Sequence, residues 1–579
     1  MKYRKNFRFY SALLAMTLVL LSLAGCGGTS PGAEGATKGQ PVEPEPDAVE
    51  TEAETAAFRP VIGLTFNSDF HYDETLGMNV NRMETELAGV DAATREACPE
   101  LADALDRVRA DALATEREAF QEREAMLSEI LAEENAVSLE LYGEMRSLIR
   151  RADAQAVSFV NAWSEYAGGI HESYGYAVHN FDTSTGAEIT LESLLTDEGA
   201  ASLNSRLGAE LDALYPDIAA SPEIAPSAMI ADYAADDYAF SIEPDGVTFW
   251  FNPYQIASYA DGLLTAKLYF DRDADILNDA YKGTSEAWFV ELGDEIPYRF
   301  AANGGTFRNV EFWEILSPDN PGWRDGFAME FDAPGGANRW IDRPTLINWE
   351  EEWTSPEGRL ITLDDTGFFD ARAYYAHIPD GDYVVVTLTL ENDYHGMVAY
   401  GADGALANKL ELMRPAVFYY PEPPENPGDW SLYDAYHISL TDPNEMPSLV
   451  RENIFGTWEA DGLYRLTREG LQLIGNLLYA SQPYELTLNQ NLTVTRMAAD
   501  NWLLSTEEEY ELPEGTAVEL VGASGDMAFF RVPEPPQGFT QNADFIFALS
   551  CDTGSWPHTV NGMDGMKEWE IFDGLHYAG

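Results

Sequence analysis

The histidine pair His171 and His179 is the first place in this sequence where metal chemistry could be sought. His171-Glu172 begins like the zinc motif His-Glu-x-x-His, but position 175 is Gly, so the second histidine of that helical motif is missing. His171 and His179 lie on a segment rich in strand formers and are too far apart to share one ion. We expect His171 to be a buried turn histidine or an interface residue, and we predict no metal site and no cofactor.

A second acidic pattern could bind calcium. Asp271-Arg-Asp273-Ala-Asp275, followed by Asp279, places carboxylates at the odd positions of a calcium loop. Ile276 stands where such a loop needs Gly, and Lys282 stands where it needs Glu. The pattern favours a solvated acidic loop, and calcium binding stays open as the alternative.

Catalytic signatures are missing from the sequence. The chain has 99 Asp and Glu residues, so paired carboxylates occur by chance and have no predictive value. We find no phosphate-binding loop, dinucleotide fingerprint, kinase motif set or Ser-x-x-Lys motif. We therefore predict no catalytic residue, with an envelope hydrolase acting on peptidoglycan or glycans as the alternative function.

Two blocks, around residues 166–195 and 249–262, combine tyrosine with turn-forming residues. The first block predicts a strand, a turn at residues 182–186, a second strand and a helix start near residue 194. Tyrosine suits interfaces because it joins apolar area to a polar tip, and paired glycines allow positive φ. The candidate binding residues are Tyr166, Gly168, Gly169, His171, Tyr174, Tyr254 and Tyr259.

These blocks resemble the extracellular domain shared by RsiV-type anti-sigma factors and PdaC-type peptidoglycan deacetylases. The matching positions are Tyr166, Gly168-Gly169-Ile170-His171, Asn180-Phe181-Asp182, Thr185-Gly186, Leu191, Leu194-Leu195 and the run of residues 249–262. Glu172 departs from the small residue of the family pattern. The resemblance covers roughly residues 59–290. It implies an α+β domain that binds lysozyme in the RsiV type and lies outside the catalytic domain in the PdaC type.

The N-terminus predicts export and lipid anchoring. A basic start is followed by an apolar run over residues 12–23 that is too short to span a bilayer, and then by Leu23-Ala24-Gly25-Cys26. This ending resembles the bacterial lipobox, in which the cysteine is diacylated, and two acyl chains give stable anchoring. Residues 27–58 are rich in Pro, Gly and Glu and predict a disordered acidic linker. We expect an extracytoplasmic lipoprotein held on the cell membrane through Cys26, in a bacterium of Gram-positive type.

The charge of the chain restricts its partners. With 34 Lys and Arg residues against 99 Asp and Glu residues, the formal net charge is −65, which opposes binding of nucleic acid. Such a field attracts cationic proteins and speeds their encounter, although acidity spread over a surface also serves solubility. Besides Cys26 there are only Cys98 and Cys551, which could form a disulfide or remain two thiols.

The hydrophobic pattern, together with the family resemblance, predicts an α+β fold with a β-rich C-terminal half. Helical spacing marks residues 99–134 and 200–214, and strands are expected at residues 61–66, 238–242, 247–251 and 264–270. We expect helices to cover a mainly antiparallel sheet over residues 59–290. Residues 291–579 predict one or two sandwich or barrel-like modules of short strands, interrupted by a helix at residues 466–479.

Together these features favour a cell-surface binding or sensing lipoprotein over an enzyme. The resemblance implies recognition of lysozyme or of cell-wall components, and the acidic charge suits a cationic, lysozyme-like protein. An anti-sigma role is not expected, because only about ten residues precede the apolar run of the signal.

Overall fold

The computed structural model describes residues 58–577. This description leaves out residues 75, 131–140, 169, 295, 303–305, 317–323, 332–353, 356–357, 362–367, 391–394, 402–409, 413–417, 420–435, 499–500, 534–544, 555–556 and 564. Cys26, the predicted linker and Gly169 are therefore not described. Within the described part, helices are either too short or too polar to cross a membrane.

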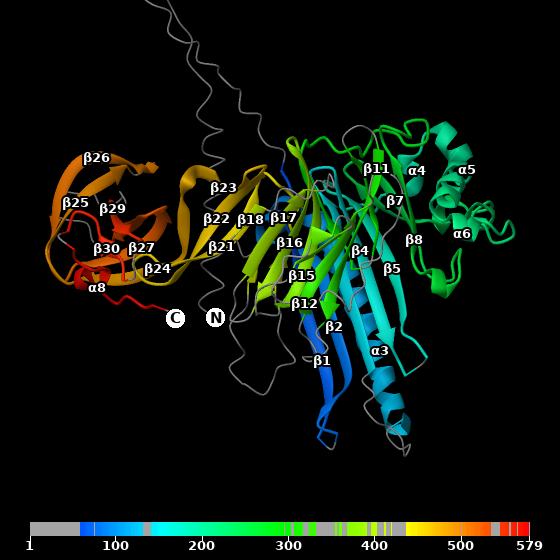
Figure 1. Ribbon diagram of the computed structural model, residues 1–579, viewed down its shortest axis with the longest axis horizontal. Coiled ribbons are helices and arrows are strands. Elements are labelled where there is room, and N and C mark those ends of the chain that lie inside the picture. The colour runs from blue at the N-terminus through cyan, green and yellow to red at the C-terminus, as the bar shows by residue number, and fades with distance from the viewer. Residues whose placement is uncertain are drawn as a thin grey trace, which may run out of the picture.

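A seven-stranded sheet lies at the centre of the molecule, with the order β19-β20-β1-β2-β3-β4-β5 (Figure 1). Its strands are β1 (Ile62–Asp73), β2 (Met78–Val90), β3 (Leu141–Ala152), β4 (Ala156–Tyr166), β5 (Ser173–Asp182), β19 (Phe418–Tyr419) and β20 (Tyr436–Ile438). Neighbouring strands are antiparallel except β2 and β3, which run parallel. A parallel pair needs a crossover, and the chain supplies it with the short helix α2 (Ala92–Ala97) and the long helix α3 (Pro99–Ile130).

Helix α3 confirms the helix predicted from residue 99. Pro99 occupies its first turn, where the missing N–H costs nothing. Leu101 and Leu105 are buried and pack with Ile62, Leu64 and other residues of the sheet. Helix α3 runs beside the β1–β2 hairpin, and both extend beyond the other strands at one end of the sheet (Figure 1).

A smaller sheet, β6-β7-β8, carries the second sequence block. Its strands are β6 (Ala239–Glu243), β7 (Gly246–Phe251) and β8 (Leu264–Tyr269), which confirms the three strands predicted there. The accompanying helices are α4 (Leu191–Leu194), α5 (Asp197–Leu214), α6 (Pro216–Ala219), α7 (Pro226–Met229), η1 (Ala235–Asp237) and η2 (Tyr259–Asp261). Leu203, Leu207 and Leu211 form the buried stripe of α5 and pack on this sheet, so the amphipathic pattern reflects a real core contact.

Two larger antiparallel sheets make up most of the C-terminal half. The first contains β9 (Trp288–Leu292), β10 (Tyr298–Ala302), β11 (Thr306–Leu316), β12 (Arg324–Phe331), β13 (Thr354–Ser355), β14 (Gly358–Ile361), β15 (Phe368–Ile378), β16 (Gly381–Leu390), β17 (His395–Gly401) and β18 (Leu410–Leu412). The second contains β21 (Met446–Glu452), β22 (Trp458–Thr467), β23 (Gly470–Leu473), β24 (Leu478–Leu488), β25 (Leu492–Ala498), β26 (Asn501–Leu512), β27 (Ala517–Ser524), β28 (Met527–Val532), β29 (Phe545–Asp552), β30 (Thr559–Val560) and β31 (Phe572–Asp573), with η6 (Ile474–Asn476) and α8 (Glu568–Ile571).

These sheets agree with a strand-rich α+β protein. Between residues 58 and 577, as far as they are described, none of the sheets closes into a barrel, so the barrel form of the C-terminal prediction is wrong.

The helix predicted at residues 466–479 is also wrong. This stretch is the end of β22, the strand β23, the turn η6 and the start of β24. Gly470 and Gly475 have φ values of 129° and 75°, which a continuing helix does not accept. Apolar residues in two short, closely spaced strands can imitate helical spacing, and the glycines were the signal that distinguishes the two.

Buried charges connect the sheets to one another. Arg150 of β3 contacts Glu243 of β6 through Nε at 3.0 Å and donates to the backbone oxygen of Glu291 in β9 at 2.7 Å. Lys267 of β8 lies 2.6 Å from Glu243 and 3.2 Å from the hydroxyl of Tyr298. All five residues are almost fully buried, so each charge depends on its partners for the solvation that water would otherwise supply.

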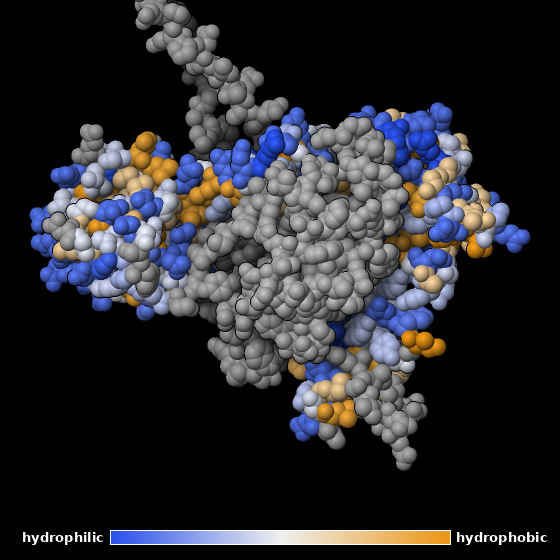
Figure 2. All heavy atoms as spheres, viewed as in Figure 1, coloured by the Kyte–Doolittle hydropathy of each residue, from blue (hydrophilic) through white to orange (hydrophobic). Residues whose placement is uncertain are grey.

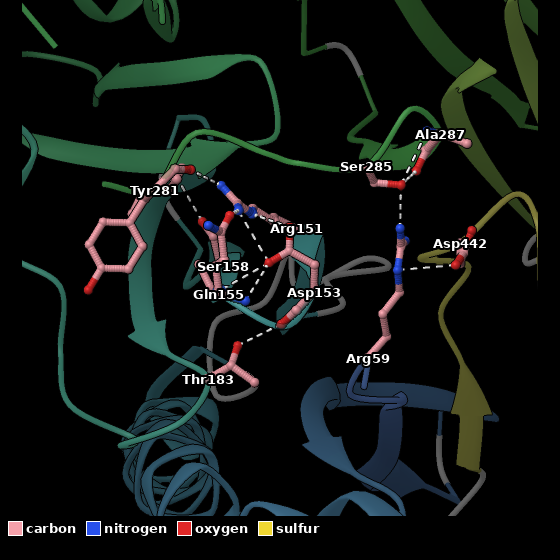
Figure 3. Close-up of polar contacts among 12 residues, drawn as sticks. Arg59, Arg151, Asp153, Gln155, Ser158, Thr183, Tyr281, Ser285, Ala287 and Asp442 are labelled. Atoms are coloured by element: carbon pink, nitrogen blue, oxygen red, sulfur yellow. Dashed lines mark hydrogen bonds and ion pairs between the residues drawn. The ribbon is translucent and has the colours of Figure 1, made fainter. Parts of the chain in front are cut away.

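The end of β3 is closed by Arg151. Its Nε donates to Asp153 at 2.7 Å, a further nitrogen donates to Gln155 at 2.8 Å, and a third reaches the backbone oxygen of Tyr281 (Figure 3). Nearby, Arg59 contacts Asp442 at 3.1 Å and donates to Ser285 (Figure 3). Arg59 thus fixes the start of the described chain to segments more than two hundred residues away. These contacts stabilise one end of the central sheet, where β3 ends and β4 begins; the β4–β5 turn lies at the other end.

Candidate functional site

The connection between β4 and β5 carries most of the candidate residues of the first block. Tyr166 is the last residue of β4, and Gly168 adopts a φ of 87°, as the paired glycines predicted. His171 is exposed and lies in the turn, because β5 begins only at Ser173. The prediction that His171 lies on a strand is wrong. Its predicted place in a turn is confirmed, but the expected burial is wrong, because the side chain is exposed.

The loop at residues 252–263, between β7 and β8, carries Tyr254 and Tyr259. Tyr254 has a φ of 69°, which is uncommon for a residue with a Cβ. Ser258 directly precedes the short helix η2, and its backbone N–H and its hydroxyl both donate to Asp261 Oδ2 within that helix, at 2.9 and 2.6 Å. Gly262, with a φ of 73°, then returns the chain to β8. The loop is therefore held by its own hydrogen bonds.

Four of the predicted residues meet in one aromatic cluster. The ring of Tyr259 is stacked on His171, with centroids 4.1 Å apart, and its other neighbours are Tyr174 at 5.5 Å and Tyr254 at 5.6 Å. We call His171, Tyr174, Tyr254 and Tyr259 the tyrosine cluster. The two sequence blocks, some eighty residues apart, thus form a single surface.

Glu172 ties the tyrosine cluster to the end of the central sheet. The hydroxyl of Tyr259 donates to the backbone oxygen of Glu172 at 2.7 Å, and Tyr142 donates to the Glu172 carboxylate at 2.5 Å. The ring of Tyr142 in turn lies 6.0 Å from that of Tyr166, so Tyr142 connects Tyr166 to Glu172. Burial and the nearby Glu172 raise the pKa of both Tyr142 and Tyr259, so both hydroxyls remain donors.

Tyr176 and Asn252 support the cluster from beneath. Tyr176 lies 6.3 Å from Tyr174 and 5.6 Å from the buried Trp250. The side chain of Asn252 bonds to both backbone groups of Tyr176 and so fixes the loop against β5. Sequence reasoning singled out neither Asn252 nor Tyr142 as a site residue; Asn252 stood inside the second sequence block, next to Pro253, and that was the available signal.

The cluster offers aromatic faces beside carboxylates. Tyr254 is 69% exposed, and the adjoining Ile170 is fully exposed. Glu172 and the exposed Asp261 lie on the same two loops. Electron-rich ring faces next to carboxylates can hold a cationic side chain.

The other histidine of the first block lies elsewhere. His179 is in β5, where its ring packs on Phe159 at 5.1 Å, and burial lowers its pKa. Among the described residues there is no group of three or more histidine, cysteine or acidic side chains arranged to hold a metal.

Asp273 explains the acidic pattern at residues 271–279. It is fully buried and accepts hydrogen bonds from Arg206 Nε at 3.1 Å, Arg272 Nε at 2.8 Å and the backbone of Tyr269 at 2.8 Å. The prediction of a solvated loop is wrong for this residue, because two guanidinium groups take the place that a cation would need.

A cysteine, a histidine and a carboxylate meet in the C-terminal half without any sequence signal. Cys551 and His558 both contact the buried Glu568, at 3.5 and 3.2 Å, and Tyr577 donates to it at 2.8 Å. Burial and the Glu568 charge raise the pKa of the Cys551 thiol, which opposes nucleophilic activation. Cys98 and Cys551 are both free thiols.

Part of the region around the tyrosine cluster matches a known protein family. Residues 194–271, which form the small sheet and its helices, match the family "Protein of unknown function (DUF3298)". The match includes the loop that carries Tyr254 and Tyr259, and it begins at residue 194, at the end of the first sequence block. This part of the chain is thus a DUF3298 domain.

Two solved structures of that family are also similar. A member from Bacteroides fragilis is 19% identical, with a TM-score of 0.29, covering 37% of this chain and 94% of its own. A member from Pseudomonas aeruginosa is 14% identical, with a TM-score of 0.27, covering 39% of this chain and 97% of its own. No curated protein matches the chain. Similarity at this level carries no argument about function.

Proposed function

We propose that the protein is a recognition protein of the bacterial cell surface, anchored through Cys26, which binds a cationic, lysozyme-like protein at the tyrosine cluster. The anchor rests on the lipobox-like residues that end at Cys26 and on the apolar run before them. The binding role rests on the cluster and on the charge of the chain.

The observation that carries this proposal is the packing of the tyrosine cluster. Tyr259 is held between His171 and Tyr254 and by a hydrogen bond to Glu172, so the surface is ordered before any ligand arrives. A rigid surface loses little conformational entropy on binding. A cation on an aromatic face gains about 0.5–2 kcal/mol, and the net charge of −65 brings cationic partners to the surface faster.

The test is a titration of the full chain with a cationic lysozyme. At ~10 mM salt the Debye length is roughly 30 Å, and at ~150 mM it is roughly 8 Å, so only a defined contact survives the change. Tyr254→Ala is expected to weaken binding roughly tenfold or more. Tyr479→Ala, at another exposed tyrosine in the C-terminal half, serves as the matched control and is expected to bind normally.

Three results would contradict this proposal. They are a lack of binding, binding that disappears at the higher salt, and an equal loss in both tyrosine variants. The anchor is tested separately by mass spectrometry of the mature N-terminus, and an unmodified Cys26 in the cell-associated protein would overturn it.

A further inference from the structure

The tip of the β1–β2 hairpin exposes apolar side chains. Phe70 is 42% exposed, Tyr72 52% and Leu76 42%, and we call these three residues the hairpin tip. Figure 2 shows hydrophobic residues at the lower end of the molecule, where Figure 1 places this hairpin and the end of α3. Large apolar side chains gathered on a projecting element mark an interaction surface more often than scattered ones do.

The hairpin tip is held in place by α3. Glu124 of α3 lies 2.8 Å from His71 Nδ1 and accepts a hydrogen bond from Asn81 at 2.7 Å. The turn itself is closed by Asp73, whose carboxylate accepts from Leu76 N at 3.0 Å and whose backbone oxygen accepts from Gly77 N at 2.8 Å. The backbone around the tip is therefore braced by hydrogen bonds, as the loop of the tyrosine cluster is.

Strand register places the hairpin tip and the tyrosine cluster at the same end of the central sheet. Asn81 of β2 pairs with Leu141 at the start of β3, and Tyr142 pairs with Tyr166 at the end of β4. The β4–β5 turn, with His171, follows directly. With strands about 4.8 Å apart, the four steps from β1 to β5 place the two surfaces roughly 19 Å apart across the sheet, and the tip also extends further along the strand direction.

The space between them is also aromatic and acidic. The ring of Tyr142 lies there with Arg82 over its face at 5.6 Å, and Arg82 is in turn paired with Glu144 at 2.7 Å and Glu84 at 2.5 Å. A sugar ring or a single side chain occupies only one end of such a surface. A folded protein, which covers about 800 Å² of a partner, spans both.

We propose that the hairpin tip and the tyrosine cluster are two halves of one interface for a folded protein whose apolar patch is ringed by Lys and Arg. This inference rests on the proposed function and adds a second contact surface to it. The carboxylates of Asp69, Asp73 and Glu74 border the tip, and Glu172 and Asp261 border the cluster, so a basic rim complements both halves. The same charges, within a net charge of −65, oppose an anionic membrane or a second copy of the chain.

The experiment measures binding of a cationic lysozyme to the full chain with three surface variants. The double variant Phe70→Ser/Tyr72→Ser changes the tip, Tyr254→Ala changes the cluster, and Leu504→Ser changes a 58% exposed leucine elsewhere as the control. The tip variant is expected to weaken binding at least tenfold, mainly by faster dissociation, while Leu504→Ser has no effect. Unchanged thermal unfolding of each variant verifies that the fold is intact.

The outcomes separate this inference from the proposed function. Binding that depends on Tyr254 but not on the tip overturns the two-part interface and leaves the proposed function standing. If neither the wild-type protein nor any variant binds lysozyme, both the two-part interface and the proposed function are overturned. Tip-dependent binding to anionic phospholipid vesicles, or tip-dependent dimers in sedimentation, assigns the tip to a membrane or to self-association and overturns the inference. Binding of a soluble amino-sugar oligomer that depends on Tyr254 alone also overturns it.

Discussion

Asn252 uses both ends of its side-chain amide on the backbone of Tyr176. Its Oδ1 accepts from Tyr176 N at 2.8 Å, and its Nδ2 donates to Tyr176 O at 3.1 Å. The asparagine thereby takes the place of a neighbouring strand along β5 and attaches the loop at residues 252–263 to the central sheet. Stability and binding are coupled at this contact.

Asn252→Ala is expected to destabilise the protein by about 1–3 kcal/mol, because two backbone groups lose their partner. It is also expected to weaken lysozyme binding, since the loop carries Tyr254 and Tyr259. Urea denaturation and titration measure the two effects. Asn252→Asp keeps the acceptor and loses the donor, so it is expected to fall between the wild type and Asn252→Ala; equal stability of all three proteins would contradict this account.

Glu243→Gln is expected to destabilise the protein by about 3–5 kcal/mol at pH 7, because it breaks a buried pair with Arg150 and Lys267. Burial alone would raise the pKa of Glu243, but the two cations hold it below its usual range. A lowered pKa adds stability above the unfolded-state pKa of about 4.3, and this stability is lost as the pH falls through the folded-state pKa.

The deficit of Glu243→Gln should therefore shrink in acid. Chemical denaturation at pH 7 and at a series of lower pH values measures it. The exposed Glu223→Gln is the matched control and is expected to be neutral. A deficit that stays constant down to the lowest pH would contradict the assigned ion pair.

Gly186→Ala is expected to cost about 2 kcal/mol more than Gly515→Ala. Both glycines have positive φ, 62° and 84°, so both substitutions carry the same conformational cost. A Cβ at Gly186 would lie 2.3 Å from the backbone oxygen of Glu100, whereas a Cβ at Gly515 would meet nothing within 4 Å. Thermal unfolding of the two variants separates backbone strain from steric clash. Equal losses of stability would show that a Cβ at position 186 does not clash with the backbone of α3.

Glu116→Gln is expected to stabilise the protein at pH 8 by on the order of 1 kcal/mol. Burial raises the pKa of Glu116 to about 7, the nearby Arg123 opposes this, and Glu165 adds to it. A carboxyl whose folded-state pKa is raised makes the protein less stable as the pH rises from about 4.5 to about 7, because the folded state then binds more protons than the unfolded state.

Removing that group should flatten this part of the stability profile. The exposed Glu118→Gln on the same helix is the control and should keep the slope of the wild type. A slope that persists in Glu116→Gln would assign it to other groups.

Local structure in the N-terminal half was predictable because single segments contain their own signals. The turn at residues 182–186 formed as predicted, since the Asp182 carboxylate accepts the backbone N–H groups of Ser184 and Thr185, at 3.1 and 2.9 Å. The second strand predicted after it is reduced to one bridge, at Glu188, and α4 starts at Leu191.

The partners of the candidate residues were not predictable in the same way. Tyr259 stacks on His171 across 88 residues of chain, and Asn252 reaches Tyr176 across 76. β20, far along the chain, pairs with β1. No local pattern encodes which of many tyrosines or strands will meet, because that choice depends on how whole sheets pack.

The sequence by itself determined the residue types of the candidate site, the turns that flank them and the strong negative charge, since these follow from side-chain chemistry and local backbone preference. The tertiary structure decided that His171, Tyr174, Tyr254 and Tyr259 form one surface, that Asp273 is neutralised internally, and that the hairpin tip lies at the same end of the sheet. The physical reason is that these relationships arise from contacts between segments distant in the chain, where packing and burial of charge select one arrangement.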